Sequence, residues 1–387
     1  MPWKETGAME QKELFIQQML QNKKPFKHLC AEFGISEKTG HKWKNRFFAE
    51  GRAGLTELSR TPKSSPNSLP ENTVINLLNL KYAHPAWGPK KILALYEKAH
   101  YKDIPSLSSV NRVLNKACLV KKRKIRKVEA SSNRLRQRIL PEAANDVWAI
   151  DFKGWWKSDG EICEPLTVRD LYSRYALEIK LMESKTSAAV RDVLTGLFKT
   201  YGLPKVIRTD NGTPFTASHA VLTLTDLSAW WITLGITPDR IEKGKPGQNG
   251  SLERMHADIA NEIEGKTGGG RRPNQAVLDA WREEYNHVRP NEAIGMKTPA
   301  ELYTLSERKY QGDFDELEYP AGYLPRKVFG NGTVSVFGIR VSLSYSLRGL
   351  TVGLKLIESG KYHVFLADFL LGVLDINLCC FIPLDTV

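Results

Sequence analysis

Three acidic residues stand where a carboxylate could do chemistry. Asp151 ends an apolar, aromatic stretch that is typical of a β-strand. Asp210 ends a second such stretch, and Glu253 lies in the first turn of a predicted helix, after the glycine-rich loop 243–250. A carboxylate among apolar strand residues is costly unless it has a partner. These three side chains therefore need partners, and one partner could serve all three.

Each carboxylate alone has a simple structural explanation. Asp210 begins an Asp-Asn-Gly sequence, which is a common turn, and the helix dipole favours Glu253 in a first turn. Asp151 could be a strand-end cap. Brought together, the three would repel one another and their pKa values would rise unless a cation screened them. Mg²⁺ or Mn²⁺ prefers such oxygen ligands, and two of these ions can clamp the attacking and leaving oxygens of a phosphoryl displacement.

The elements that must position these residues form an α/β pattern from residue 146 onward. Hydrophobic alternation predicts strands at 147–152, 162–168, 174–181 and 205–209, the first three as an antiparallel meander. Helical periodicity predicts helices at 186–200, 218–234, 251–264 and 273–287. Residues 325–387 alternate in short runs between glycine turns, which predicts a small β-barrel or sandwich.

Positive charge is concentrated in the first third of the chain. The net charge is +13, and residues 1–140 hold 28 Lys and Arg against 11 Asp and Glu, a net charge of +17. The remainder carries −4. A basic segment on a near-neutral body is typical of nucleic-acid binding. The alternative is a basic tail that maintains solubility, but the segment has helical periodicity, which such a tail lacks.

Residues 10–48 have helix-turn-helix patterning. Helices are expected at 10–20, 26–33 and 36–48, with Gly34 in the turn and Ser36 as the N-cap of the third helix. That third helix is the expected recognition helix. Gly40 inside it counts against the assignment, at about 1 kcal/mol relative to Ala. Its expected DNA-contact residues are Lys38, Lys42, Lys44 and Arg46.

A second helical unit follows a linker of Gly, Ser, Pro and Thr at 51–70. Helices are expected at 71–83, 89–99 and 108–117, and the last of these carries Arg112 and Lys116 on its outer face. The basic run 121–127 comes next. Such a run can be a solvated face or a nuclear-localisation signal; beside two recognition helices, phosphate contact is the better interpretation, by Lys121, Lys122 and Arg123.

Composition narrows the class of protein further. Hydrophobic residues make up 41% and charged residues 26% of the 387 residues, as in soluble globular proteins. The polar N-terminus predicts no signal peptide, and no apolar run predicts a membrane span. Five scattered cysteines form neither a disulfide framework nor a Cys-x-x-Cys zinc site. We expect reduced thiols in a cytoplasmic protein.

Several ordered motifs carry a family resemblance. Residues 146–305 resemble the integrase catalytic core of the DDE transposase and retroviral integrase superfamily, and nearly the whole chain is similar to small bacterial insertion-sequence transposases. The motifs are WAIDFKG (148–154), LTVRDLYSRYALEIK (166–180), IRTDNGTPF (207–215), LGITPDRI (234–241), KPGQNGSLERMH (245–256) and EYNHVRPNEAIGMKTPAELY (284–303).

The resemblance implies an RNase H-like core with Asp151, Asp210 and Glu253 as catalytic residues that bind two Mg²⁺ or Mn²⁺ ions. It implies strand cleavage followed by transfer of a DNA 3′-hydroxyl, with double-stranded DNA as partner: terminal inverted repeats and target. It further implies a homo-oligomer, a dimer or tetramer on paired ends, working in the bacterial cytoplasm at the nucleoid. The expected domains are 1–65 and 66–140 (helix-turn-helix units and basic linker), 141–310 (core) and 311–387 (β-barrel).

Two departures from the family pattern bear on the site. Between Asp210 and Glu253 lie 42 residues, more than in relatives, which fits a longer surface segment around 217–227 because loop entropy grows slowly with length. Relatives often carry Lys or Arg two helical turns after the Glu, where this chain has Ala260. We expect Lys153, Arg254 and His256 to contact DNA there instead, with end binding weaker or differently arranged.

Several other residues are expected to be structural. His287 and Arg289 are interpreted as holding a helix end together, and six tryptophans as core aromatics: Trp148, Trp155, Trp156, Trp230, Trp231 and Trp281. Two rival functions remain open. One is a DNA-binding repressor or relic with an inactive core, and the other is a simple nuclease of the same fold.

Overall fold

The computed structural model describes residues 7–57, 68–99, 103–120, 139–216, 224–242, 250–312 and 317–384. Its chain divides into two compact units, Met1–Ser68 and Leu69–Val387. The predicted segment 1–65 lies within the first unit, the predicted segment 66–140 begins three residues before the second unit, and the segments 141–310 and 311–387 lie within the second unit.

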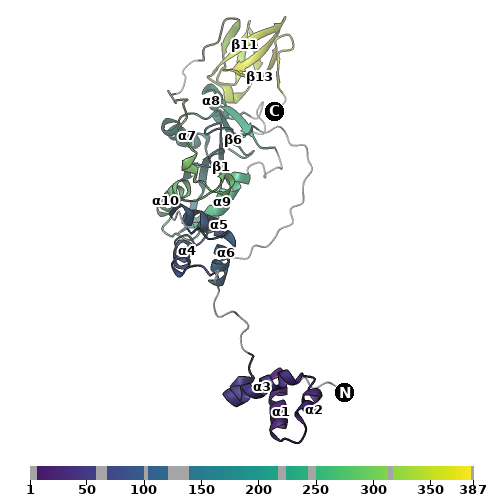
Figure 1. The fold of residues 1–387 in the computed structure, drawn as a ribbon. Helices are drawn as coiled ribbons and strands as arrows, with labels where there is room; N and C mark the ends of the chain where they lie inside the picture. Colours follow the sequence, from purple (N-terminus) through teal and green to yellow (C-terminus); the bar gives the residue numbers. More distant parts are fainter. Residues whose placement is uncertain are drawn as a thin grey trace. The chain divides into compact units, whose positions relative to one another are not determined.

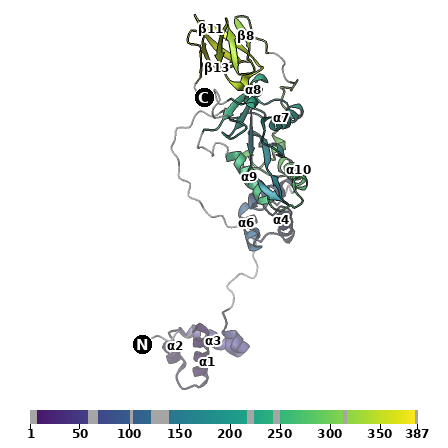
Figure 2. The same cartoon turned by 180° about the vertical axis from the view of Figure 1, so that it is seen from behind.

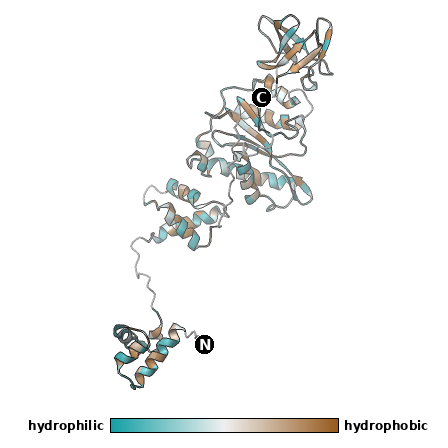
Figure 3. Cartoon of the chain, turned by 90° about the vertical axis from the view of Figure 1, so that its right-hand side faces the viewer, coloured by the Kyte–Doolittle hydropathy of each residue, from teal (hydrophilic) through white to brown (hydrophobic). Residues whose placement is uncertain are grey.

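The first unit is a three-helix bundle made of α1 (Ala8–Leu20), α2 (Phe26–Glu32) and α3 (Glu37–Glu50), followed by a 3₁₀ turn at Gly51–Leu55. Phe15, Leu29 and Trp43 form its buried centre. As predicted, Gly34 takes a positive φ of 65° in the turn, and the Ser36 side chain accepts a hydrogen bond from the Thr39 backbone N–H at the start of α3. Brown and teal segments alternate along these helices in Figure 3, as amphipathic packing requires.

Gly40 has a packing role that corrects the objection raised against it. A Cβ at this position would lie 2.6 Å from Cys30 Sγ and 3.0 Å from Phe26 Cζ. The missing side chain is therefore what lets α3 approach α2. The helix-propensity cost is offset by a closer contact, so Gly40 supports the helix-turn-helix assignment.

A second set of three helices opens the larger unit: α4 (Glu71–Ala83), α5 (Pro89–Ala99) and α6 (Leu107–Lys116). Its centre consists of Leu77, Trp87, Ile92, Tyr96, Val110 and Leu114. The Ser106 side chain accepts a hydrogen bond from the Ser109 backbone N–H, which caps α6. Sequence periodicity predicted all three helices, with bounds that agree to within one residue.

The core is a five-stranded sheet with helices on both faces. The strands are β1 (Val147–Phe152), β4 (Pro165–Asp170), β5 (Ala176–Leu181), β6 (Val206–Thr209) and β7 (Thr237–Arg240), in the order β5-β4-β1-β6-β7. β1 pairs antiparallel with β4 and parallel with β6. A short hairpin of β2 (Trp156–Ser158) and β3 (Glu161–Cys163) interrupts the predicted meander. The prediction missed β7, whose Pro238 is tolerated because β7 is an edge strand.

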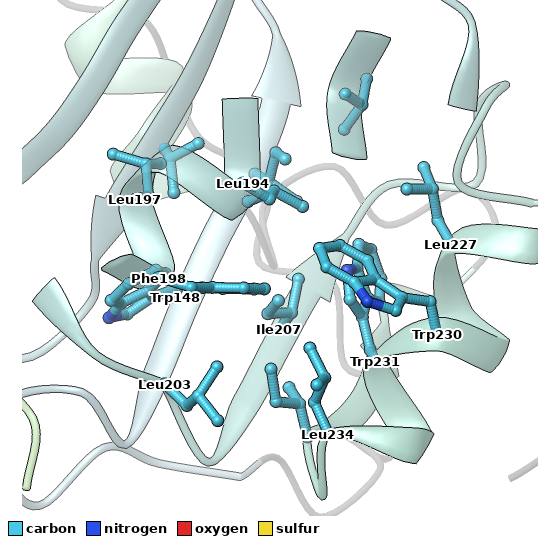
Figure 4. Close-up of a cluster of buried hydrophobic side chains, with 14 of the residues drawn as sticks. Trp148, Leu194, Leu197, Phe198, Leu203, Ile207, Leu227, Trp230, Trp231 and Leu234 are labelled. Atoms are coloured by element: carbon cyan, nitrogen blue, oxygen red, sulfur yellow. The ribbon is translucent and has the colours of Figure 1, made fainter. Parts of the chain in front are cut away.

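Alternation along β1 sends its side chains to two different cores. Trp148 and Ile150 pack with α7 (Ser187–Tyr201) and α8 (Asp226–Thr233). Figure 4 shows Trp148 against Phe198 on that face. Val147 and Ala149 face the opposite core, which α9 (Gly250–Glu262) and α10 (Arg271–His287) complete. The start of the predicted helix 218–234 lies partly outside the described residues, and α8 itself begins at Asp226.

Five of the six tryptophans expected in the core are buried, but Trp155 is 59% exposed. The expectation was wrong for this residue because β1 ends at Phe152, and the alternation that buries Trp148 does not continue into the loop before β2. Trp156, one residue on, is the buried member of the pair.

The C-terminal strands do not close into the predicted barrel in the part of the chain described here. A five-stranded antiparallel sheet, in the order β14-β13-β12-β11-β8, packs with a separate two-stranded sheet over one core. The strands are β8 (Tyr323–Lys327), β9 (Thr333–Val336), β10 (Ile339–Ser342), β11 (Thr351–Glu358), β12 (Lys361–Leu366), β13 (Phe369–Asp375) and β14 (Cys380–Pro383). Alternation sets which face of a strand is buried, but it does not set whether the edge strands meet.

Helix α8 joins this β-domain to the core. Its Ala229 and Ile232 belong to the β-domain core, whereas Trp230 and Trp231 pack on the central sheet. Arg348 forms a two-pronged ion pair with Asp226 at the helix start, at 2.9 and 2.8 Å. The five cysteines form no disulfide, and none of the described helices is both long and apolar enough to cross a membrane.

Candidate active site

The two aspartates lie at the same end of two neighbouring inner strands of the sheet. In the parallel β1–β6 ladder Ile150 is opposite Thr209. Asp151, near the end of β1, and Asp210, directly after β6, are each one residue further on. Both strands are buried up to this point. Alternation along β1 places Asp151 on the α9 face, where Glu253 starts the helix.

The Asp151 carboxylate is affected by the charges of both other acidic residues. Burial, together with the charges of Asp210 and Glu253, raises the Asp151 pKa to about 7. A hydrogen bond from the Phe152 backbone opposes the shift. Like charges that gather in a low-dielectric site favour protonation or a bound cation. The site is thus arranged to gain from a positive ion.

Asp210 presents a buried oxygen that has no partner among the residues that the structure describes. Its Oδ1 atom is buried and makes no hydrogen bond to any described residue. The loop around it is held by a hydrogen bond from Asn211 Nδ2 to the Ile241 carbonyl, at 2.8 Å. Gly212 lies close against the carboxylate: a Cβ there would come within 2.9 Å of Asp210 Oδ2. A bare buried carboxylate oxygen is costly, and a divalent cation would satisfy it.

Glu253 lies in the first turn of α9 and is exposed. The buried face of the same helix, Leu252, Met255 and Ile259, packs in the core with Trp281. The loop before α9, residues 243–249, lies outside the described residues, as does segment 217–223, where the extra length between Asp210 and Glu253 was expected.

The donor chemistry fits a hard divalent cation. All three side chains offer carboxylate oxygens, the ligands that Mg²⁺ and Mn²⁺ prefer. Within the described ranges no three His, Cys, Asp or Glu side chains lie close enough to hold a metal ion. The triad therefore supplies suitable donors at a wider spacing than a filled site has.

Two of the core residues expected at DNA are turned inward. Lys153 is 6% exposed and pairs with Glu264, with 2.6 Å between Nζ and Oε2. His256 is hydrogen-bonded to Thr167, and its pKa is lowered to about 4, chiefly by burial and then by Lys153 and Arg169. Arg254 alone of the three points outward: its side chain is 63% exposed and lies 3.6 Å from Asp258.

The expected contact residues of the helical units differ in exposure. Lys38 and Lys42 are exposed on α3, and Lys44 and Arg46 are half-buried. Lys42 lies 4.4 Å and Arg46 5.4 Å from the centre of a Trp43 ring, on which they pack. Arg112 and Lys116 are exposed on α6. Lys121, Lys122 and Arg123 lie outside the described residues.

Arg289 is a supporting residue whose importance the sequence showed only in part. Its guanidinium is 5% exposed and pairs with Asp258 and Glu262 of α9, each at 2.9 Å. It also lies over the rings of Trp281, at 5.6 Å, and Trp87, at 5.8 Å. Its role therefore goes beyond the expected one of holding a helix end: Arg289 connects α9 to the second helical unit. No local pattern indicated Trp87.

Further contacts hold the second helical unit against the core, where Figures 1 and 2 show it next to α9 and α10. His84 stacks on Trp87 and lies 2.8 Å from Glu284. Lys98 pairs with Glu301 at 3.1 Å. Burial and the nearby Arg289 lower the Lys91 pKa to about 8, although Asp258 and Glu262 oppose that shift.

Comparisons with known proteins indicate an enzyme of the polynucleotidyl-transferase type. The family models described as "Integrase core domain" match residues 141–246 and 234–299. A "Helix-turn-helix domain" matches residues 11–63, and a "Homeodomain-like domain" matches residues 39–114.

Two curated relatives come from insertion elements. The uncharacterized 31.7 kDa protein of insertion element IS407 from Burkholderia multivorans is 30% identical over 60% of this chain and 81% of its own length. The uncharacterized 39.2 kDa protein of IS476 from Xanthomonas euvesicatoria is 27% identical over 58% of this chain and 57% of its own length. The chain therefore belongs to the family of insertion-element transposases that carry an integrase core.

Among solved structures, the HTLV-2 integrase catalytic core domain in complex with magnesium is similar to this chain. The matched region covers 42% of this chain and 99% of the HTLV-2 chain. The identity is 16% and the TM-score 0.33.

Proposed function

We propose that this protein is an active DDE transposase that moves its own element. Asp151, Asp210 and Glu253 would hold two Mg²⁺ or Mn²⁺ ions, and the site would cleave a DNA strand at the element end and join the freed 3′-hydroxyl to target DNA. The observation that carries the proposal is the placement of Asp151 and Asp210 at the same end of two neighbouring parallel strands. Burial and the charges of Asp210 and Glu253 raise the Asp151 pKa to about 7 there.

The chain's own residues would prepare the site. Burial and like charge keep Asp151 partly protonated at neutral pH, so binding a cation releases its proton. Gly212 leaves room for the Asp210 carboxylate, whose buried Oδ1 atom has no hydrogen-bond partner among the described residues. When bound, the ions would stabilise charge on the attacking and leaving oxygens of an in-line displacement. In cleavage, water attacks the phosphorus and the 3′-oxygen leaves; in joining, a 3′-hydroxyl attacks and a target 3′-oxygen leaves.

The basic residues would position the DNA. We assign Lys38, Lys42, Lys44 and Arg46 of α3, and Arg112 and Lys116 of α6, to the terminal inverted repeats, with Lys121, Lys122 and Arg123 on phosphates. Arg254 is the best-placed contact residue beside the triad because its side chain is exposed. A dimer or tetramer on paired ends, acting on the bacterial nucleoid, is part of the same proposal.

The test is a nicking and strand-transfer assay on the flanking inverted repeats, with and without Mg²⁺ or Mn²⁺. We expect both reactions to depend on the metal and to be lost in Asp151→Asn and Glu253→Gln. Activity that survives either substitution would overturn the site assignment. Short inverted repeats and a target duplication around the gene would independently support transposition.

The rival functions are separated by the same assay. Tight binding to the ends without cleavage would identify a repressor with an inactive core, and cleavage without joining would identify a nuclease. The structure weakens one argument for the repressor, because Gly40 is required by the packing of α3 on α2.

A further inference from the structure

A hydrogen-bonded bridge connects the two elements that carry Asp151 and Glu253. His256 lies three residues after Glu253 on α9, and its Nε2 atom is 2.8 Å from Thr167 Oγ1. Thr167 is fully buried on β4, directly opposite Asp151 in the antiparallel ladder. Its Oγ1 also donates to the Asp151 carbonyl oxygen, at 3.0 Å. One hydroxyl therefore contacts both the catalytic strand and the catalytic helix.

The direction of each hydrogen bond follows from the proton count. Thr167 has one hydroxyl proton, and it goes to the Asp151 carbonyl. The hydroxyl oxygen must then accept from His256, so the imidazole carries its proton on Nε2. The ring is neutral at physiological pH, since burial and the neighbouring Lys153 and Arg169 lower its pKa to about 4.

A second contact from the same strand reaches the first turn of α9. Arg169, two residues after Thr167 and on the same face of β4, donates from its guanidinium to the Ser251 carbonyl. Its side chain is buried and lies over the Tyr285 ring, at 5.7 Å. Strand β4 thus holds α9 at points on both sides of Glu253 in the sequence.

We propose that Thr167 and His256 are positioning residues that set the spacing between Asp151 and Glu253, and thereby the affinity of the site for divalent cations. The inference rests on the proposed function, because that assigns the cation to these carboxylates. Glu253 is exposed at the end of its helix, so its position depends on how the first turn is held. Outer partners of metal ligands typically change metal affinity or activity by 10–100-fold.

The experiment measures Mn²⁺ binding directly on the full-length protein without DNA. The rise in melting temperature with Mn²⁺ concentration gives an apparent Kd, and the electron paramagnetic resonance signal of free Mn²⁺ counts the bound ions. We expect Thr167→Val, which keeps the side-chain shape, to weaken Mn²⁺ binding about 10–100-fold. His256→Leu should weaken it to a similar extent.

Conservative variants and a matched control separate positioning from general loss of structure. Thr167→Ser keeps the hydroxyl and His256→Gln keeps an N–H donor, so both should bind Mn²⁺ to within about threefold of wild type, a smaller loss than the 10–100-fold range above. Thr73→Val removes another buried threonine hydroxyl, on α4, and should leave the affinity for Mn²⁺ unchanged. Affinity for end DNA without metal should be the same in all of these variants.

The outcomes distinguish this inference from the function on which it rests. Wild-type binding of Mn²⁺ that Asp151→Asn abolishes would support the metal site. If that holds and both Thr167→Val and His256→Leu bind Mn²⁺ like wild type, the positioning role is overturned and the metal site stands. If wild type binds no Mn²⁺ at this site, the proposed function is overturned and this inference with it.

Discussion

The central sheet and helix α9 hold the parts of the candidate active site in different ways. Asp151 and Asp210 lie at the ends of neighbouring strands whose register is set by a continuous backbone ladder. Glu253 lies in the first turn of a helix that depends on side-chain contacts from several other elements, including Arg289, Thr167 and Arg169. The sheet thus fixes two carboxylates by backbone pairing, and tertiary contacts position the third.

The difference predicts how each side responds to change. A strand cannot slip by one residue without turning its side chains to the other face, so its register is all or none. A helix packed through its side chains can shift by small amounts. Substitutions on the sheet should therefore disrupt the site abruptly, and substitutions around α9 should have graded effects.

The largest expected effect tests whether the two sides serve one site. Asp151→Asn and Glu253→Gln should each reduce strand transfer far more than the 10–100-fold typical for outer partners of a metal site, while leaving end-DNA binding intact. Strand-transfer rates and gel-shift affinities measure this. Asp192→Asn on α7, an exposed carboxylate, is the matched control. Near-normal activity in Glu253→Gln alone would remove α9 from the site.

Removing the anchor of α9 should have the next largest effect. Arg289→Ala would leave Asp258 and Glu262, 14% and 15% exposed, without their buried partner. Breaking such a pair typically costs about 3–5 kcal/mol of unfolding free energy. Denaturant melts measure this, and Arg289→Lys should recover part of the loss because it keeps the charge but not the two-pronged geometry. An unchanged midpoint for Arg289→Ala would mean that α9 is held in another way.

The pH dependence of stability tests the environment of Asp151 on the central sheet. Folded Asp151 keeps its proton up to a pKa of about 7, whereas an unfolded Asp ionises near pH 4. Its contribution to stability is therefore full below about pH 4 and is lost as pH rises towards about 7. Without metal, the melting temperature of wild type should fall more between about pH 4 and about pH 7 than that of Asp151→Asn. Equal slopes for the two proteins would contradict the raised pKa, and added Mg²⁺ should stabilise wild type most above pH 7.

A single methyl group beside Asp210 should have a moderate effect. Gly212→Ala places a Cβ 2.9 Å from Asp210 Oδ2, so the carboxylate must shift, and we expect about a tenfold loss of strand transfer. Gly196→Ala on α7 is the matched control because nothing lies within 4 Å of its added Cβ. That control should raise stability by up to about 1 kcal/mol without changing activity. Full activity in Gly212→Ala would show that Asp210 tolerates movement.

The smallest expected effect lies on the exposed face of α9. Ala260 is exposed, and Ala260→Lys adds a cation two turns after Glu253. We expect tighter end-DNA binding and a salt dependence steeper by about one charge. If affinity and salt slope stayed the same, the idea that Ala260 weakens end binding would be wrong. Ala257→Lys, at another exposed position of α9, controls for added charge alone.

Much of the secondary structure could be predicted because its signals are local. Alternation predicted β1 with its observed bounds, and helical periodicity predicted α4 and α5 with theirs. Asp151 and Asp210 lie at the same end of neighbouring parallel strands, and their grouping with Glu253 as a catalytic triad stays a prediction. The barrel prediction failed in the described residues, because closing a sheet depends on how its edge strands meet.

The sequence by itself determined most of the helices, the strand β1, the basic N-terminal third and the candidate carboxylates, since these depend on residue types at short spacings. Only the tertiary structure decided what surrounds them. Lys153 and His256 turn inward because Glu264 and Thr167 lie beside them. Trp87 meets Arg289 across two hundred residues of chain. Such contacts depend on how whole elements pack, and no local periodicity records that.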